Sequence, residues 1–465
     1  MSDGISGFDY GTSNCALGVL TNRHQDDQSQ SDVELLALEQ GKAFLPSAVY
    51  ALARELICEY VGLNIRDSER KQSFIQQRGV NLAQARRVRS EEGFDADEPS
   101  LFFGRAAFQQ YFDWPEDGYF VKSPKSFLGA SGLQPQQLGF FEDIVTAMMQ
   151  NVKQRGEQAA QRDITHTVIG RPVNFQGLNA AQSNQQALDI LSLAAQRAGF
   201  KQVEFLYEPI AAGLHYEQRL EHNQTVLVVD VGGGTTDCAL VRMGPDYRNK
   251  QDRSADFLGH SGERVGGNDL DIQLAAKQLL PLFGSESLMK TGKPVPKQAF
   301  FNAVATNDVS AQATFNSLET GLYLDQLLRD NAEPQLIQRL IRLRQQRQNH
   351  HLVRSAEQGK IRLSLESDIE LDLSYAEAGL HHTISRDAYA EAVARPVEKM
   401  VALMDEALAQ GGGLPDCIYV TGGSAQSPVV RAAIERKLGN IPVVDGDHFG
   451  SVAAGLTVWA GRIFR

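Results

Sequence analysis

The sequence predicts an α/β protein whose two halves repeat one scheme of strands and helices. Two glycine-rich turns, in GFDYGTSNCALGVL at 7–20 and VLVVDVGGGTTDCALV at 226–241, each lie between two apolar, strand-like runs. Elsewhere, apolar runs of strand type alternate with stretches of helical period. The 465 residues are also more than a single hydrophobic core usually holds. We therefore expect at least two lobes.

The two turns share a chemistry that suits a polyphosphate. Asp9 and Asp230 each end an apolar run, and glycines and hydroxyl residues follow them. Glycine lets the backbone approach an anion and direct N–H groups toward it, and an aspartate can hold a hydrated divalent cation. Two such turns could bind one triphosphate from two sides. The alternative is a pair of unrelated hairpins.

The first half reads as strands alternating with helices. It contains, in order, the hairpin at 7–20, a strand pair in AFLPSAVYA (43–51), a polar and exposed helical insertion (66–100), a helix that starts in FGRAA, a helix at 144–156, the strand ITHTVIGRPV (164–173), a helix at 180–198, and VEFLYEPIAAGLHY (203–216) as a strand running into a helix.

The second half repeats the scheme. After the hairpin at 226–241 come GGNDLDIQLA as a turn that opens an amphipathic helix, helical sequence at 312–351, the strand CIYVTGG (417–423), a helix at 428–438, and a short strand leading into a closing helix within 441–460. The segment RLIRLRQQRQNHH (339–351) is the one basic cluster. We interpret it as a solvated helix face, with a polyanion site as the alternative.

Composition excludes several classes. A formal net charge of −12 and a pI near 5.4 disfavour nucleic-acid binding. There is no apolar leader before the first strand and no apolar run long enough to span a membrane, so we expect a cytoplasmic protein without membrane contact. The four cysteines lack metal-binding spacing and are too few for a disulfide framework, and we read Cys15 and Cys238 as small buried hydrophobes.

On these motifs the chain resembles the nucleotide-binding region of the DnaK-type heat-shock chaperones, in the actin, hexokinase and sugar-kinase superfamily, and most of all the truncated, chaperone-like YegD proteins. The resemblance implies an actin-like ATPase fold of two lobes around a nucleotide cleft. Lobe I would comprise 1–222 with the closing helix 445–465, and lobe II 223–444 with a helical subdomain at about 270–365. No peptide-binding domain is expected after the closing helix.

The resemblance also assigns residues at the phosphate end of the cleft. It implies magnesium-side carboxylates at Asp9 and Asp230 and an ATP or ADP phosphate site at Gly11, Thr12, Ser13, Asn14, Gly232, Gly233 and Gly234. KSFLG (125–129) resembles the lysine-containing strand of that family, which favours Lys125 as the cation on the transferred phosphoryl, with Lys122 as its competitor. Glu208, Asp237 and Thr235 complete the expected catalytic group.

At the adenosine end the resemblance implies contacts from Gly266 and Gly267, from Glu357, Lys360 and Ser364, and from Gly422, Gly423 and Ser424. Residues three and seven apart share one helical face, so one nucleoside could touch the second set. The family stacks an arginine on each side of the base, whereas Ile361 and Gln426 stand at those positions here. Pro172 of the interlobe relay is present, but no arginine follows it until Arg197.

These features predict a chaperone-like protein that binds ATP with magnesium, hydrolyses it slowly and couples nucleotide state to lobe closure and a protein partner such as a co-chaperone. Three alternatives remain open at this point. They are a nucleotide sensor or scaffold that does not hydrolyse ATP, a small-molecule kinase of the sugar-kinase superfamily, and a filament-forming relative of actin.

Overall fold

Each glycine turn connects the two strands of a hairpin, and each hairpin lies within one of two sheets. The computed structural model describes residues 4–21, 33–95, 98–175, 179–248, 250 and 253–464. The first sheet has the strand order β3-β2-β1-β8-β9, with β4 beside β2, and the second has the order β12-β11-β10-β15-β16. The strands of the first sheet are β1 (Ile5–Tyr10), β2 (Asn14–Leu20), β3 (Val33–Leu35), β4 (Leu45–Pro46), β8 (His166–Arg171) and β9 (Gln202–Tyr207). Those of the second are β10 (Gln224–Val231), β11 (Thr236–Met243), β12 (Phe257–Glu263), β15 (Cys417–Thr421) and β16 (Val443–Asp445).

Both sheets have the same pattern of directions. In the first, β1 pairs antiparallel with β2 and parallel with β8, and β8 is parallel to β9. In the second, β10 pairs antiparallel with β11 and parallel with β15, and β15 is parallel to β16. Antiparallel strands need only a tight turn, whereas parallel strands need a long crossover. The repeat confirms the α/β fold that the sequence predicts.

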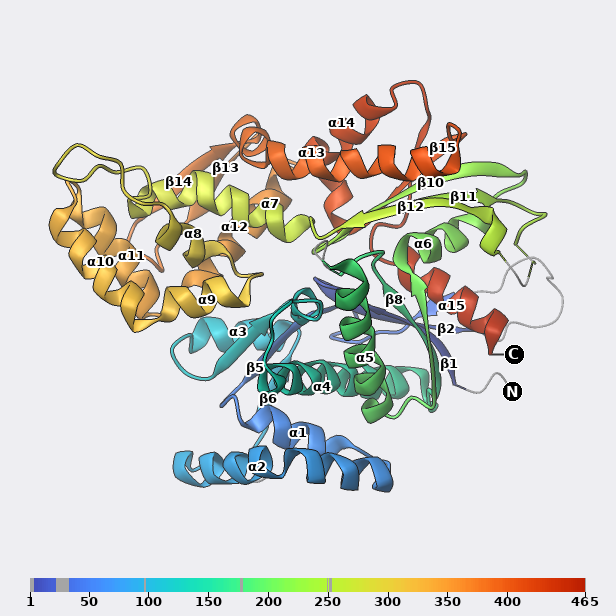
Figure 1. Ribbon diagram of the computed structural model, residues 1–465, viewed down its shortest axis with the longest axis horizontal. Helices are drawn as coiled ribbons and strands as arrows, with labels where there is room; N and C mark the ends of the chain where they lie inside the picture. Colours follow the sequence, from blue (N-terminus) through green and yellow to red (C-terminus); the bar gives the residue numbers. More distant parts are fainter. Residues whose placement is uncertain are drawn as a thin grey trace.

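Two helices join the sheets on one side of the molecule. Figure 1 shows α6 (Glu208–Glu217) and α15 (Ser451–Ile463) between the first and second sheets. Their apolar residues form one buried cluster with residues of β8 and β10, including Val168 and Val228. The helices cross so closely that a Cβ on Gly455 would lie 1.6 Å from the carbonyl oxygen of Ala211. This contact fixes the two central hairpins relative to each other.

Other helices cover the outer faces of the sheets, and two large apolar clusters lie beneath them. The first half contains α1 (Leu56–Asn64), α2 (Ser68–Glu92), α3 (Arg105–Asp113), α4 (Pro135–Ala160), α5 (Ala180–Ala198) and a small sheet of β5 (Ala48–Ala51), β6 (Leu101–Phe103) and β7 (Tyr119–Lys122). The second half contains α7 (Gly267–Leu274), α8 (Gln298–Val304), α9 (Val309–Asn316), α10 (Leu318–Asp330), α11 (Pro334–Gln345), α12 (Asn349–Leu363), α13 (Arg386–Gly411), α14 (Pro428–Lys437) and the hairpin of β13 (Asp368–Asp372) and β14 (His381–Ser385).

The polar stretch at 66–100 contains the long helix α2, which packs on α1. Only Phe74, Leu82 and Ala85 of α2 are buried. The helix is kinked at Arg78, whose side chain donates to Asp143 at 3.0 Å and to Glu142 at 2.6 Å. These charge-assisted bonds tie α2 to α4.

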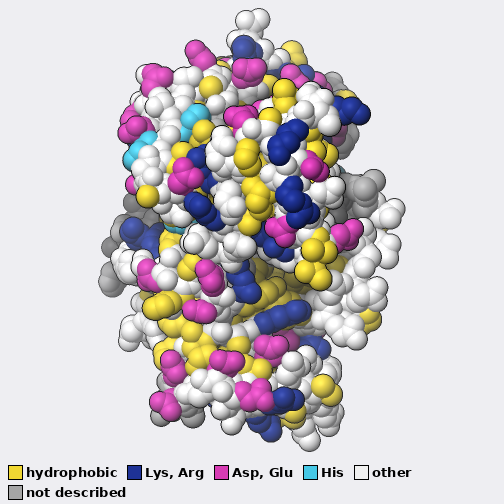
Figure 2. All heavy atoms as spheres, turned by 90° about the vertical axis from the view of Figure 1, so that its left-hand side faces the viewer, with side chains coloured by type: hydrophobic (Ala, Val, Ile, Leu, Met, Phe, Trp, Pro, Cys, Tyr) yellow, Lys and Arg dark blue, Asp and Glu magenta, His cyan; other side chains and the backbone are white. Residues whose placement is uncertain are grey.

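The basic segment at 339–351 is not simply a solvated helix face, which corrects the expectation from sequence. Arg339 is buried and pairs with Glu377 at 2.8 Å. Arg344 donates to the carbonyl oxygens of Phe315 and Ser317, at 2.8 and 2.6 Å. These guanidinium groups satisfy acceptors inside the helical region. Figure 2 shows that side of the molecule, where basic side chains are interspersed with acidic and apolar ones.

Among the described residues, no helix combines the length and the apolar character needed to cross a membrane. All four cysteines are buried and free. Cys15 and Cys238 pack within the two central hairpins, as their small, weakly polar side chains allow.

Candidate functional site

The two glycine turns touch each other at the wall of one cleft. A Cβ on Gly233 would lie 1.9 Å from Ser13 Oγ, and one on Gly234 would lie 2.7 Å from Thr12 Cγ2. Any side chain at these two positions would push the turns apart. The turns are also braced from behind, since Ser47 Oγ donates to the Gly11 carbonyl oxygen at 2.7 Å. Residues of both turns therefore line one space.

Four carboxylates surround one lysine behind the turns. The Nζ of Lys125 contacts Glu208 Oε1, and both side chains are buried. Asp9 and Asp237 also interact electrostatically with Lys125. Asp230 is 5% exposed and lies close enough to Asp237 and Glu208 to be repelled by their charges. One ammonium group therefore faces four acids, and the cluster attracts further positive charge.

The pKa values of these acids reflect that imbalance. Burial, followed by repulsion from Glu208, raises the pKa of both Asp9 and Asp237 to about 7. Burial and the neighbouring carboxylates raise the pKa of Asp230 well above its usual value. Burial opposes the charge of Lys125, but attraction to Glu208 and Asp9 outweighs it and raises the lysine pKa. Bound cations would relieve this repulsion.

Lys125 does not lie on a strand, contrary to the expectation from KSFLG. The strand β7 ends at Lys122, and Lys125 belongs to the 3₁₀ turn Pro124–Phe127. Ser123 between them has a φ of 56°, which breaks the extended backbone. The turn directs Lys125 into the acidic cluster, whereas Lys122 pairs with Glu357 at 2.7 Å. The two lysines therefore serve different parts of the cleft.

The Lys122–Glu357 pair bridges β7 and α12. Burial works against the charge of Glu357, but Lys122 and Arg354 outweigh it and hold its pKa well below the usual range. Next to this bridge, Tyr111 donates to the carbonyl oxygen of Arg347 at 2.5 Å. Both contacts join the first half of the chain to the second.

The expected adenosine residues gather on α7, α12 and the loop after β15. Lys360 on α12 pairs with Asp271 at 2.7 Å and donates to the Gly267 carbonyl oxygen at 3.2 Å. Ser424 Oγ donates to the Gly232 carbonyl oxygen at 3.0 Å, which links this end to the second glycine turn. Gly266 lies against the same turn, where its Cβ would be 2.7 Å from the carbonyl carbon of Gly233.

The cleft between these groups has a volume of about 370 Å³. Of the residues expected from sequence, its walls include Asp9, Gly11, Thr12, Ser13, Asn14, Glu208, Asp230, Gly232, Gly233, Thr235, Glu357, Lys360, Ser364, Gly422, Gly423 and Ser424. The lining does not include the other expected residues Lys125, Asp237, Gly234, Gly266 and Gly267. Ser364 is the residue that follows the last turn of α12, so it shares the wall with Glu357 and Lys360 without being inside the helix.

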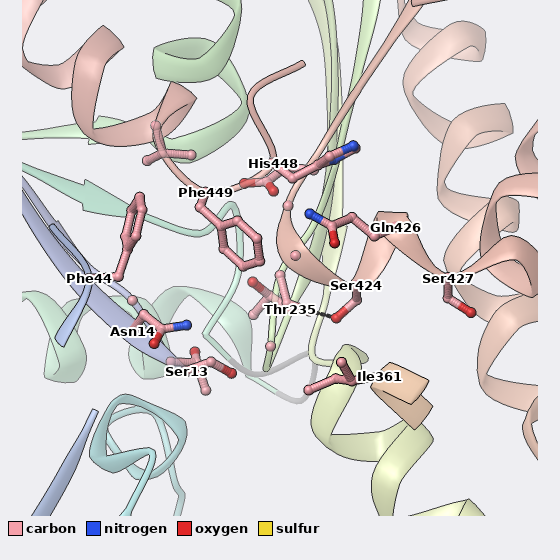
Figure 3. A pocket seen from close by; sticks show the side chains of 18 of the residues that line it. Ser13, Asn14, Phe44, Thr235, Ile361, Ser424, Gln426, Ser427, His448 and Phe449 are labelled. Atoms are coloured by element: carbon pink, nitrogen blue, oxygen red, sulfur yellow. Dashed lines mark hydrogen bonds between the residues drawn. The ribbon is translucent and has the colours of Figure 1, made fainter. Parts of the chain in front are cut away.

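Sequence reasoning missed several side chains of the cleft. Figure 3 shows Phe44, His448 and Phe449 in its wall, together with Ile361 and Gln426. Phe44 precedes β4, and the other two lie in the loop between β16 and α15. The sequence DHF (447–449) lies in a short polar loop. Such a loop has no periodicity from which the position of its side chains could be predicted. Asp271, the partner of Lys360, was also missed because it lies within an amphipathic helical pattern.

The strand end at Pro172 touches the acidic cluster. The backbone N–H of Val173 donates to Asp237 Oδ1 at 2.6 Å. Arg171 lies over the ring of Tyr207, 4.8 Å from its centroid. Arg197 lies elsewhere, buried with its guanidinium 3.5 Å from Asp143 of α4. The arginine found by sequence downstream of Pro172 therefore belongs to a different cluster.

Within the described part of the chain, no group of three or more His, Cys, Asp or Glu side chains is placed to hold a metal ion by itself. Asp9 and Asp230 each bring a carboxylate to the cleft, the ligand type that a hydrated magnesium ion takes. This ion keeps several waters and usually takes one or two carboxylates together with substrate phosphates.

Comparison with known proteins agrees with this geometry. The model of the Hsp70 protein family matches residues 133–281. The chain is 24% identical over 470 aligned residues to the chaperone protein DnaK of Halobacterium salinarum strain R1, and the same values hold for DnaK of strain NRC-1. Each alignment covers 99% of this chain and 56% of the chaperone, so the chain spans about half the length of these relatives.

The duplicated sheets around a cleft define an α/β protein of the Hsp70 and actin-like ATPase fold. Together with the sequence matches, this fold makes the chain similar to proteins of the Hsp70 family. The narrower likeness to the YegD proteins stays a prediction.

Proposed function

We propose that the protein binds ATP with magnesium in the cleft between the two glycine turns and hydrolyses it slowly, as a chaperone-like ATPase. The observation that carries this proposal is the contact of the two turns in front of a lysine and four carboxylates. Glycine-rich turns can direct backbone N–H groups toward phosphates. The kinship with Hsp70 chaperones supports the same function and does not favour the kinase, filament or non-hydrolysing alternatives.

The side chains divide the work of phosphoryl transfer among themselves. Lys125 supplies fixed positive charge near the transferred phosphoryl group, where negative charge develops in the transition state. Glu208 and Asp237 accept hydrogen bonds and can orient a water for attack. Thr235 offers a hydroxyl to the γ-phosphate. Magnesium bound with ATP through Asp9 and Asp230 would neutralise charge on the phosphate oxygens.

The nucleotide would also control how the two halves close. Glu357, Lys360 and Ser424 come from the second half, whereas Asp9, Ser13 and Lys125 come from the first. A nucleotide that contacts both sets binds the closed arrangement better than an open one, so it shifts the population toward closure. A protein partner that distinguishes the two states could read this change.

Calorimetry with ATP and magnesium, followed by single-turnover phosphate release, tests the proposal. Lys125→Ala should lower the hydrolysis rate at least about tenfold, about 1.4 kcal/mol in barrier height, with a smaller loss of affinity. Thr235→Ala should act in the same direction. Lys122→Ala should mainly weaken binding, because its partner Glu357 lies at the nucleoside end. Unaltered turnover in Lys125→Ala would contradict the assignment.

A further inference from the structure

The nucleoside end of the cleft lacks the flat cations that would stack on a base. Ile361, which is 56% exposed, and Gln426 line this end of the cleft, and the resemblance to the DnaK-type chaperones implies that they take the places of two arginines. An aliphatic chain and an amide can contact a purine but cannot stack on it as a guanidinium group or an aromatic ring does. If ATP binds here, another side chain must supply a flat surface for the base.

Phe449 supplies such a surface. Its ring lines the cleft and is 44% exposed, although it belongs to a residue type that is usually buried. The ring lies against the backbone of the loop after β15, since a Cβ on Gly423 would be 2.8 Å from Phe449 Cε1. The exposed part of the ring therefore forms part of the cleft wall, beside polar groups and other apolar side chains such as Val452. A flat, apolar ligand would cover it.

A second aromatic ring supports Phe449. The centroid of Phe44 lies 5.7 Å from that of Phe449, with the ring planes inclined at 52°. This distance is typical of favourable aromatic pairs. Figure 3 shows Phe449 between Phe44 and Gln426, with Ile361 elsewhere in the wall of the same pocket. The pair is thus held by elements from both halves of the chain, the segment before β4 and the loop before α15.

We propose that Phe449, supported by Phe44, stacks on the base of the bound nucleotide in place of a guanidinium pair. This inference rests on the proposed function and adds the residue that holds the base. Stacking of a base on an aromatic ring contributes to binding and does not depend strongly on which base is present. Phe449 should therefore contribute equally to ATP, ADP and GTP, and nothing to a ligand that has only phosphates.

Titration calorimetry of the whole chain with magnesium tests this. The ligands are a non-hydrolysable ATP analogue, ADP, GTP and inorganic tripolyphosphate. Phe449→Ala should weaken all three nucleotides about tenfold or more and leave tripolyphosphate unchanged. Phe449→Tyr should bind like the original protein, whereas Phe449→Leu should stay close to the alanine variant because it has no ring. Leu414→Ala removes a 71% exposed apolar side chain outside the cleft and should change nothing.

Several results would overturn the inference. Unchanged nucleotide affinity in Phe449→Ala, or full affinity in Phe449→Leu, would show that no aromatic face is used. Tighter binding in Phe449→Ala would show that the ring blocks the cleft. In each case the original protein still binds ATP, so the proposed function stands. If the original protein binds neither ATP nor tripolyphosphate, both the proposed function and this inference fail together.

Discussion

Replacing Asp237 by asparagine should stabilise the nucleotide-free protein at neutral and alkaline pH. Asp237 is 1% exposed, and burial together with repulsion from Glu208 raises its pKa from 3.8 to about 7. The folded state therefore holds its proton more tightly than the unfolded state. Between these two pKa values the unfolded chain binds fewer protons, so the free energy of unfolding falls as pH rises from about 4 to about 7.

The magnitude follows from the size of the shift. About three pH units correspond to about 4 kcal/mol at pH 8, which is an upper bound because surrounding groups relax. Asparagine keeps an oxygen that can accept the 2.6 Å hydrogen bond from the Val173 N–H. We therefore expect Asp237→Asn to gain about 1–3 kcal/mol at pH 8 and much less at pH 5.

Urea denaturation in the presence of EDTA, at pH 5 and pH 8, measures this gain. Asp325→Asn is the matched control, because Asp325 is exposed on α10. The same Asp237→Asn variant should release phosphate from ATP more slowly, since it loses a carboxylate that orients water. A variant that is less stable than the original protein at both pH values, or whose gain does not grow with pH, would refute the reasoning.

Two further predictions concern the turns and the contact between the halves. Gly233→Ala places a Cβ 1.9 Å from Ser13 Oγ, so calorimetry should show at least about tenfold weaker ATP binding. The control variant Gly439→Ala should bind ATP as the original protein does, because there is open space around Gly439. Burial against Phe120, with Lys122 nearby, lowers the pKa of His350 from 6.5 to about 4, so stability should fall as pH drops through that window. His350→Phe should lose less stability between pH 7 and pH 5 in urea titrations, and an equal acid sensitivity would contradict the assignment.

The strand and turn pattern could be predicted because few other residue types could occupy its key positions. Gly233 and Gly234 lie where a Cβ has no room, and Asp9 and Asp230 are each the last residue but one of a strand whose apolar run is plain in the sequence. The same reasoning failed at Lys125. Pro124 and the positive φ of Ser123 end the strand early, and their effect on the following three residues depends on tertiary packing.

Side chains that act across the fold could not be predicted in the same way. Arg339 and Arg344 look like a solvated charge cluster, but carbonyl oxygens from other helices are their partners. Phe449 stands in a loop without periodicity, and only the approach of Gly423 and Phe44 reveals its place in the cleft. Local sequence patterns predict backbone conformation, whereas these side-chain contacts join segments far apart in the chain.

The central claim is that two facing glycine turns hold one nucleotide. A crystal structure of the chain with a non-hydrolysable ATP analogue and magnesium tests it most directly. We expect the triphosphate between 11–14 and 232–235, with Lys125 on the γ-phosphate side and the base toward Phe449. A nucleotide bound outside this cleft, or a cleft that stays empty at millimolar ligand, would contradict the account.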